Sequence, residues 1–284
     1  MAVQVATMDG GELPPGADEV EFYVPPLFAS QPALAAIAQM PRLRVVQTVT
    51  AGVETLLPHI PPGVTLCNAR GAHDAGTAEW VVAAILASVR DFPYFAAEQA
   101  GRRWSYRFTD SLAGKTVLIV GYGSIGGAVE RRLAGFEVTV RRVARGAREG
   151  VAPVSQLPEL LPESDVVVVL APVTEETIGM VDAGFLAQMK DGALLVNAAR
   201  GSLVVTDALV EELRRGRLRA ALDVVDPEPL QPDHPLWGFP NVLITPHVAG
   251  STSVSATRVL EFVRAQAMRY SRGEPMMNVV TGTY

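Results

Sequence analysis

The chain has 284 residues, of which 49% are hydrophobic and 19% are charged, and its formal net charge at pH 7 is -6. This length allows two compact domains or one large one, and the composition is that of a folded protein rather than a disordered one. The acidic balance provides no basic surface for nucleic acid.

No part of the sequence is typical of a membrane or secretion segment. No apolar run approaches the roughly 18 residues of a membrane span, and the amino terminus lacks a basic start followed by an apolar stretch. We therefore expect a cytoplasmic protein with neither a membrane nor a nucleic acid as its partner.

Cysteine and histidine are too rare for a disulfide or a thiolate zinc site. The chain has one cysteine, Cys67, and four histidines. We accordingly predict no metal. Cys67 lies in the apolar stretch VTLCNA, which favours a strand residue over a nucleophile.

The first 90 or so residues are irregular, with proline pairs that mark turns. A helical stretch, Ala78–Val89, then leads through Asp91-Phe92-Pro93, which we interpret as a hinge or domain crossing. A second long helix is expected at Val254–Tyr270, near the other end of the chain, where it could pack on the first part.

From about residue 115, short β-branched runs alternate with helical stretches, as in βαβ units with a parallel sheet. One helix, Asp207–Arg215, is apolar on one face and can end at Gly216. The runs are continuously apolar, which suits strands buried on both faces. The predicted strands are Thr116–Val120, Val138–Val140, Asp165–Leu170, Ala193–Val196, Leu218–Leu222 and Val242–Thr245.

The sequence therefore predicts an α/β fold of two domains. A Rossmann-type dinucleotide-binding domain, residues 93–264, is expected to be inserted in a smaller, flavodoxin-like α/β substrate domain. That smaller domain comprises residues 1–92 and is completed by residues 265–284.

A glycine loop follows the first regular strand, in Gly121-Tyr-Gly123-Ser124-Ile125-Gly126, and a helical segment follows the loop. In this arrangement Gly121 permits a tight turn, Gly123 lets the backbone approach a pyrophosphate, and Gly126 lets the helix pack on the strand. The helix amino terminus offers N–H groups to the phosphates. The motif alone is weak, but its place between strand and helix predicts dinucleotide binding rather than a purely structural turn.

The next predicted strand ends in arginines where NAD-binding proteins carry a carboxylate for the ribose 2′-OH. The segment reads Arg141-Arg142-Val-Ala-Arg145 and contains no acid. Guanidinium groups suit the 2′-phosphate of NADP. We therefore predict that NADP(H) is preferred and NAD(H) possible, although the same arginines could form a solvated turn.

Three further segments follow predicted strands and contribute one arginine, one carboxylate and one histidine. They contain Arg200 in NAARG, Glu228 in DVVDPEP and His247 in TPH. Ligands of open α/β folds bind at the carboxyl ends of the strands. Reduction of a keto acid needs a cation for the carboxylate, a proton donor for the carbonyl oxygen, and an acid that keeps the donor charged. Each residue alone could be structural, but the set predicts a catalytic site.

With these motifs in view, the sequence resembles the D-2-hydroxyacid dehydrogenase family, which includes glyoxylate/hydroxypyruvate reductases and phosphoglycerate dehydrogenases. The resemblance extends from about Gln47 to Thr252 and depends on NAARGSLV, ALDVVDPEPL, HPLW and ITPHVAGST, which occur in the family's order. The glycine loop and APVTEETIGMV support it. Before that turn this chain has Leu170-Ala171-Pro172 where many members have histidine or cysteine, so the keto acid selected is left open.

The resemblance implies roles for particular residues. Arg200 would bind the substrate carboxylate, His247 would be the acid/base, and Glu228 would pair with His247. The substrate would also meet the loop Ala51-Gly52-Val53. Besides the glycine loop and the arginines, the implied cofactor contacts are Pro172, Thr177, Ala198, Ala199, Asp223 and Gly250. By the same resemblance we expect a homodimer and an oxidoreductase that reduces a small 2-keto acid, such as glyoxylate or hydroxypyruvate, to the D-2-hydroxy acid.

Two other functions are considered on the same scaffold. One is a nucleotide-sensing binding protein, which the complete Arg, Glu and His set argues against. The other is oxidation of formate or phosphite, which is disfavoured because formate enzymes of the superfamily carry glutamine at the position of Glu228. Cofactor oxidation with a panel of keto acids separates these hypotheses.

Overall fold

The computed structural model describes residue 13 and residues 15–27 and 30–281. The chain divides into a larger unit, Asp74–Thr252, and a smaller unit made of Met1–His73 and Ser253–Tyr284. These boundaries differ from the expected ones near residues 92 and 264. The reason is packing: helix α2 (Asp74–Val89) buries Val81 and Ile85 in the core of the larger unit, and helix α8 (Ser253–Ser271) belongs to the smaller one.

The larger unit, every residue of which is described, contains one seven-stranded parallel sheet in the order β10-β9-β8-β7-β4-β5-β6. The order reverses between β4 and β7, the arrangement of a doubly wound dinucleotide fold. The strands are β4 (Thr116–Val120), β5 (Thr139–Ala144), β6 (Ala152–Pro153), β7 (Val166–Val169), β8 (Leu194–Asn197), β9 (Arg219–Leu222) and β10 (Val242–Ile244).

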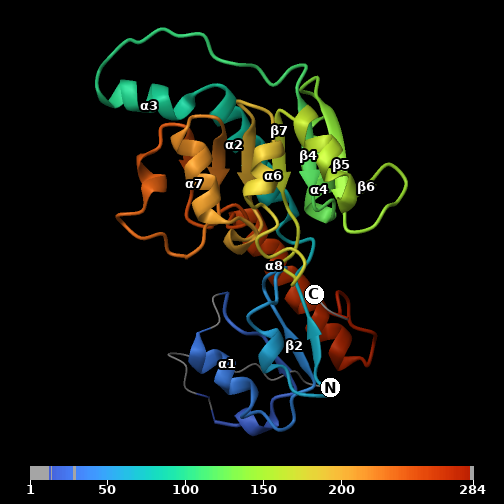
Figure 1. Cartoon of the computed structure of the whole chain (residues 1–284). Helices are drawn as coiled ribbons and strands as arrows, with labels where there is room; N and C mark the ends of the chain where they lie inside the picture. Colours follow the sequence, from blue (N-terminus) through green and yellow to red (C-terminus); the bar gives the residue numbers. More distant parts are fainter. Residues whose placement is uncertain (1–12, 14, 28–29, 282–284) are drawn as a thin grey trace. The chain divides into compact units, whose positions relative to one another are not determined.

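Helices cover both faces of this sheet (Figure 1). Alternate side chains of the strands point to opposite faces, so Val117 and Ile119 pack with α2 and α4, whereas Leu118 and Val120 pack with α6 and α7. Burial of each such side chain contributes about 1.5–3 kcal/mol. The remaining helices of this unit are α3 (Phe92–Ala100), α4 (Ser124–Leu133), α5 (Leu157–Leu160), α6 (Ala183–Gln188) and α7 (Thr206–Arg214), with short 3-10 helices at Val154–Gln156, Leu161–Glu163, Gly201–Leu203 and Pro235–Gly238.

The strand register aligns the carboxyl ends of the central strands. Val120 lies opposite Val169, Val169 opposite Asn197, and Asn197 opposite Leu222. The residues that follow these strands therefore gather at one edge of the sheet, which we call the carboxyl edge. The opposite edge, where the strands begin, is the amino edge.

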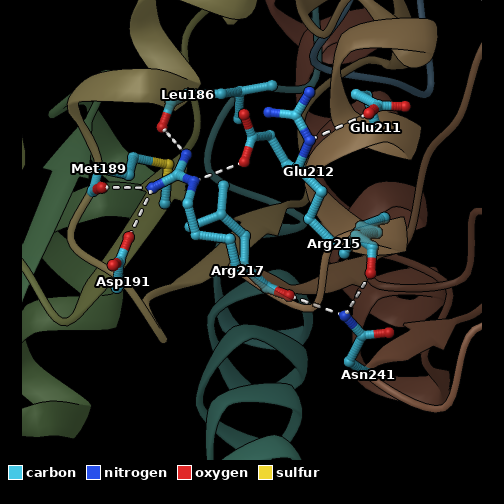
Figure 2. A network of polar contacts seen from close by, with 10 residues as sticks. Leu186, Met189, Asp191, Glu211, Glu212, Arg215, Arg217 and Asn241 are labelled. Carbon is cyan, nitrogen blue, oxygen red and sulfur yellow. Dashed lines mark hydrogen bonds and ion pairs between the residues drawn. The ribbon is translucent and has the colours of Figure 1, made fainter.

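At the amino edge, Arg217 joins two helices to the start of β9 (Figure 2). Its guanidinium donates to the carbonyl oxygens of Leu186 and Met189, at 2.5 and 2.8 Å, and these carbonyls lie at the end of α6. It also forms ion pairs with Glu212 of α7 and with Asp191. Because one cation satisfies several groups at helix ends, this network is structural.

The described part of the smaller unit has a parallel sheet in the order β1-β2-β3, with strands Phe22–Tyr23, Val45–Gln47 and Thr65–Cys67. Its helices are α1 (Gln31–Ile37) and α8, with 3-10 helices at Ala17–Glu19 and Leu57–His59. Cys67 is the last residue of β3, which confirms that it is a strand residue. Burial raises the pKa of its thiol to about 11, so the protonated and unreactive thiol predominates at neutral pH.

Most predicted elements have the expected type, with ends shifted by a few residues, but the segment after α2 was misinterpreted. Asp91-Phe92-Pro93 is not a domain crossing: Asp91 precedes helix α3, and both lie inside the larger unit. Pro93 occupies the first turn of α3, where a missing N–H is tolerated. Among the described residues no single helix is long and apolar enough to cross a membrane, although α2 and α3, bent by 67°, pass that test together by length and composition.

Candidate active site

The glycine loop has the geometry that its three glycines predict. Gly121 has a φ of 97°, and a Cβ there would lie 2.3 Å from the backbone nitrogen of Ala171. A Cβ on Gly123 would meet nothing within 4 Å, so the backbone is open to an approaching phosphate. A Cβ on Gly126 would lie 3.2 Å from Ile119, because α4 packs closely on β4. The loop therefore fits the pyrophosphate of a dinucleotide.

Arg200 follows β8 and precedes the short helix Gly201–Leu203. Asn197 holds this turn: its Nδ2 donates to the Arg200 carbonyl at 2.9 Å, and its Oδ1 accepts from Ala199 N at 3.1 Å. The Arg200 guanidinium donates to the Ala199 carbonyl at 2.7 Å and is half-buried. Buried Asn197 thus fixes the backbone from which the cation projects.

Asp223, directly after β9, organises the neighbouring loop. Its carboxylate is 3% exposed and accepts from Thr245 Oγ1 at 2.6 Å and from the backbone N–H groups of Val248 and Ala249 at 2.9 Å each. A buried carboxylate needs such donors. Its visible role is to hold the loop that carries His247, and its expected contact with the cofactor stays a prediction.

His247 and Glu228 form the predicted pair. His247 Nδ1 lies 2.9 Å from Glu228 Oε2, and Glu228 Oε1 accepts from the backbone N–H of Val225 at 3.1 Å. His247 has a φ of 53°, a left-handed conformation that is uncommon for a residue with a side chain, and its N–H donates to Asp223 O at 2.7 Å. The carboxylate engages Nδ1 and so orients the ring, which makes Nε2 the ring nitrogen for exchange of a proton with a substrate.

Hydrogen bonds connect the arginine and the histidine across neighbouring strands. Asn197 binds the Arg200 carbonyl through its side chain, Asp223 N donates to Asn197 O at 3.0 Å, and His247 N donates to Asp223 O. Consequently Arg200, Glu228 and His247 are held on one backbone framework at the carboxyl edge. A cation and a proton donor supported by a carboxylate can bind an acid and protonate its carbonyl oxygen.

Two residues that the sequence did not single out support this framework. A Cβ on Gly201 would lie 1.9 Å from Val225 O, so only glycine lets the Arg200 turn lie against the segment that leads to Glu228. Thr245 supplies the hydroxyl that Asp223 accepts. The sequence signal for Gly201 was its place directly after Arg200.

The other expected cofactor residues lie in or after the helices and strands of the larger unit and make varied contacts. Ser124 begins α4 and its hydroxyl lies 3.3 Å from Asp74 Oδ1, while Ile125 packs against the core. Thr177 Oγ1 donates to Pro172 O at 2.7 Å, which closes that loop. Ala198 and Ala199 follow β8, and Gly250 lies in the turn after His247. Their contacts with a cofactor stay predictions.

The arginines after the second strand are placed differently from the expectation. β5 continues through Ala144, so Arg141 and Arg142 lie within the strand and not after it. Pairing with β4 extends the strand, and the charges are tolerated because Arg141 is exposed and Arg142 forms a two-pronged ion pair with Glu130 of α4, with distances of 2.9 and 3.0 Å from Nε. Arg145 follows the strand and is exposed.

The expected substrate loop of the smaller unit is fixed from within that unit. Asn68 Nδ2 donates to Ala51 O at 2.9 Å, Thr50 Oγ1 donates to Gly52 O at 2.7 Å, and Val53 is buried. Of the other histidines, His234 caps the 3-10 helix at Pro235–Gly238 by accepting from Leu236 N, in keeping with a structural role. No group of metal-ligating side chains occurs in the described part of the chain.

The fold, glycine loop and edge residues define a dinucleotide-binding α/β oxidoreductase. Residues 82–249 match the family model for the D-isomer specific 2-hydroxyacid dehydrogenase NAD binding domain. A glyoxylate reductase from Thermofilum pendens is 34% identical over 249 residues, covering 82% of this chain and 74% of the relative. The chain therefore belongs to the D-2-hydroxyacid dehydrogenase family, whose members transfer hydride between NAD(P)(H) and 2-keto or 2-hydroxy acids.

Other relatives agree with this family. The D-3-phosphoglycerate dehydrogenase of Archaeoglobus fulgidus is 35% identical over 227 residues, but the match spans only 43% of that relative's length. A D-isomer specific 2-hydroxyacid dehydrogenase from Xanthobacter autotrophicus in complex with NADPH superposes with a TM-score of 0.84 at 32% identity, covering 97% of this chain and 88% of that one. An NADPH-dependent glyoxylate/hydroxypyruvate reductase from Sinorhizobium meliloti has a TM-score of 0.81 at 31% identity, covering 92% and 84%.

Proposed function

We propose that this protein reduces a small 2-keto acid, of the size of glyoxylate or hydroxypyruvate, to the D-2-hydroxy acid with NADPH as the preferred reductant. The observation that carries the proposal is the 2.9 Å contact between His247 Nδ1 and Glu228 Oε2, on the same framework as Arg200. The relatives and structures named for these activities, several of them in complex with NADPH or NADP, support it.

In this reaction His247 donates its Nε2 proton to the carbonyl oxygen of the substrate. Glu228 holds the ring through Nδ1 and offsets the charge of the imidazolium. Arg200 binds the substrate carboxylate and polarises the ketone. The backbone of Ala51-Gly52-Val53 is proposed to bind the same carboxylate. When bound at the glycine loop, the reduced nicotinamide supplies the hydride.

Steady-state kinetics test the proposal. Glyoxylate, hydroxypyruvate, pyruvate, phenylpyruvate and 3-phosphohydroxypyruvate are each measured with NADPH and with NADH. We expect the highest kcat/KM with a two- or three-carbon keto acid and NADPH. Cofactor binding without oxidation by any of these acids would instead support a nucleotide-sensing binding protein.

We further propose that the working form is a homodimer through the larger unit. Trp104, Tyr106 and Phe108 are 101%, 81% and 89% exposed on the segment that follows α3. Such aromatics bury about 150–250 Å² each, so two copies would cover about 900–1,500 Å², close to the size of a specific interface. Light scattering of the protein and of Trp104→Ser tests this: the parent should have the dimer mass, and the variant a lower one at equal concentration.

We propose no nucleic-acid or membrane partner and a cytoplasmic location. The substrate and cofactor are small charged molecules, and the net charge of -6 disfavours contact with nucleic acid. Fractionation of cells that produce the protein tests the location. Recovery in the membrane fraction would contradict it.

A further inference from the structure

Of the three arginines that the sequence suggests for the adenosine end of the cofactor, Arg142 is already engaged by another side chain. Arg142 is half-buried, and its guanidinium is occupied by Glu130, with a further bond of 3.3 Å to Gly150 O. The hydrogen bonds from Arg142 lower the pKa of Glu130, so this carboxylate is charged at neutral pH and neutralises its partner. Arg142 is therefore part of the scaffold.

The same ion pair anchors the glycine loop. The hydroxyl of Tyr122, which lies between Gly121 and Gly123, donates to Glu130, and the Arg142 guanidinium lies 5.8 Å from the centre of the Tyr122 ring. Thus Glu130 and Arg142 position the loop to which the pyrophosphate is proposed to bind.

Arg148 differs from the other arginines of this region in both backbone and side chain. Its backbone forms two hydrogen bonds with Val151, at 3.1 and 2.8 Å, which close the loop after β5. Its guanidinium donates to the carbonyl of Tyr122 and lies 5.7 Å from the ring centre. Arg148 is exposed, and among the described residues no carboxylate, including the adjacent Glu149, forms an ion pair with it. A positive charge is therefore held at the glycine loop beside the end of β5.

In dinucleotide folds the ribose 2′ position lies between the glycine loop and the end of the second strand. We infer that Arg148 is the residue that binds the 2′-phosphate of NADP(H) and so determines the cofactor preference. This inference depends on the proposed function for the nature of the ligand. It follows from geometry because Arg148 alone among these arginines combines a fixed backbone, a contact with the glycine loop and an unneutralised charge.

The test is calorimetric binding of 5′-AMP and 2′,5′-ADP, which differ by the 2′-phosphate, to the whole protein. The parent should bind 2′,5′-ADP more tightly. Arg148→Ala should weaken 2′,5′-ADP by about 10- to 100-fold, the value of a charge-assisted contact, and 5′-AMP by less than threefold. Arg148→Lys should retain part of the difference in affinity between 2′,5′-ADP and 5′-AMP, because it keeps the positive charge. Arg145→Ala tests one of the arginines that the sequence suggests for the 2′-phosphate. The matched control is Arg131→Ala, an exposed arginine of α4, which should change both affinities little.

The ion pair between Glu130 and Arg142 provides a second variant. Arg142→Gln should change the affinities for the two nucleotides by the same factor, because this ion pair orders the glycine loop for either one. A loss confined to 2′,5′-ADP in Arg142→Gln or in Arg145→Ala, with Arg148→Ala unchanged, would overturn the inference but leave the NADPH preference intact. Equal affinities of the parent for the two nucleotides would overturn both.

Discussion

The two edges of the seven-stranded sheet are both rich in charge, yet they differ in what the charged groups contact. At the amino edge, Lys190 pairs with Asp165 at 2.6 Å and Arg219 with Asp91 at 2.9 Å, and Arg217 binds helix ends (Figure 2). At the carboxyl edge, buried Asn197 and Asp223 bind backbone groups, and half-exposed His247, Glu228 and Arg200 project from the loops that they hold.

A cavity in the surface does not by itself mark the functional edge of the sheet. A cavity of about 180 Å³ lies at the amino edge, lined by Asp165, Lys190 and Arg219 among others. Lys115 and Lys190 pair with carboxylates of the same lining, and Arg219 and Asp191 pair with Asp91 and Arg217 outside it, so each charged group of the cavity already has a partner. A functional edge is recognised by exposed reactive atoms on a buried polar framework, and neither charge nor cavity volume is sufficient.

The largest expected effect is at the carboxyl edge, in His247→Ala. Loss of the proton donor should lower kcat by about 10²–10⁴-fold, while the dissociation constant of NADPH changes less than threefold. Turnover with glyoxylate or the best keto acid, and fluorescence titration of NADPH, measure the two quantities. His59→Ala removes an exposed histidine of the smaller unit and is the control. Turnover within a factor of two of the parent would exclude His247 as the donor.

The next effect tests whether the backbone framework matters as much as the side chains. In Gly201→Ala the added Cβ would meet Val225 O at 1.9 Å, so the Arg200 turn must move. A shift of about 1 Å can cost about 10²-fold in rate, and we expect kcat/KM to fall by that order. Gly238→Ala, whose Cβ would meet nothing within 4 Å, is the control. Parent-like kcat/KM in Gly201→Ala would show that this close approach is not needed.

At the amino edge the loss should appear in stability. Arg217→Ala removes the guanidinium donor from the carbonyls of Leu186 and Met189, of which Leu186 O keeps the N–H of Met189, and it leaves Glu212 without its ion-pair partner. The free energy of unfolding should therefore fall by about 2–3 kcal/mol. The control Arg215→Ala breaks only an exposed pair with Glu211 and should cost less than about 1 kcal/mol. Urea unfolding measures both. Similar losses in the two variants would mean that the network adds nothing beyond a surface pair.

The smallest effect concerns pH at the amino edge. Burial raises the pKa of Asp165, but hydrogen bonds from Lys190 and from Thr116 N outweigh it, and the pKa lies below its ordinary value. The charged form therefore stabilises the fold above the unfolded pKa of about 3.9, and this contribution is lost as the pH falls through the lower folded pKa. Asp165→Asn should thus be less stable than the parent at pH 7, with a gap that narrows toward pH 3. A gap that does not change with pH would contradict this role.

Local patterns in the sequence were enough to predict the parallel sheet and the glycine loop. They were also enough to select Arg200, Glu228 and His247 as catalytic candidates. Continuous apolar runs predict buried strands, as at Thr116–Val120, because both faces must be covered by helices. Ligands of such sheets bind at the carboxyl ends of the strands, so polar residues that follow predicted strands could be selected as catalytic candidates. These features depend on residues that are close in sequence.

Tertiary contacts decided the remainder. β5 runs on through two arginines because β4 pairs with it and Glu130, twelve residues away, binds Arg142. Gly201 is required only because the carbonyl oxygen of Val225 approaches it. Arg148 is a candidate for binding the 2′-phosphate only because its side chain contacts Tyr122 in the glycine loop. No local periodicity encodes such contacts, since each depends on where another part of the chain lies in space.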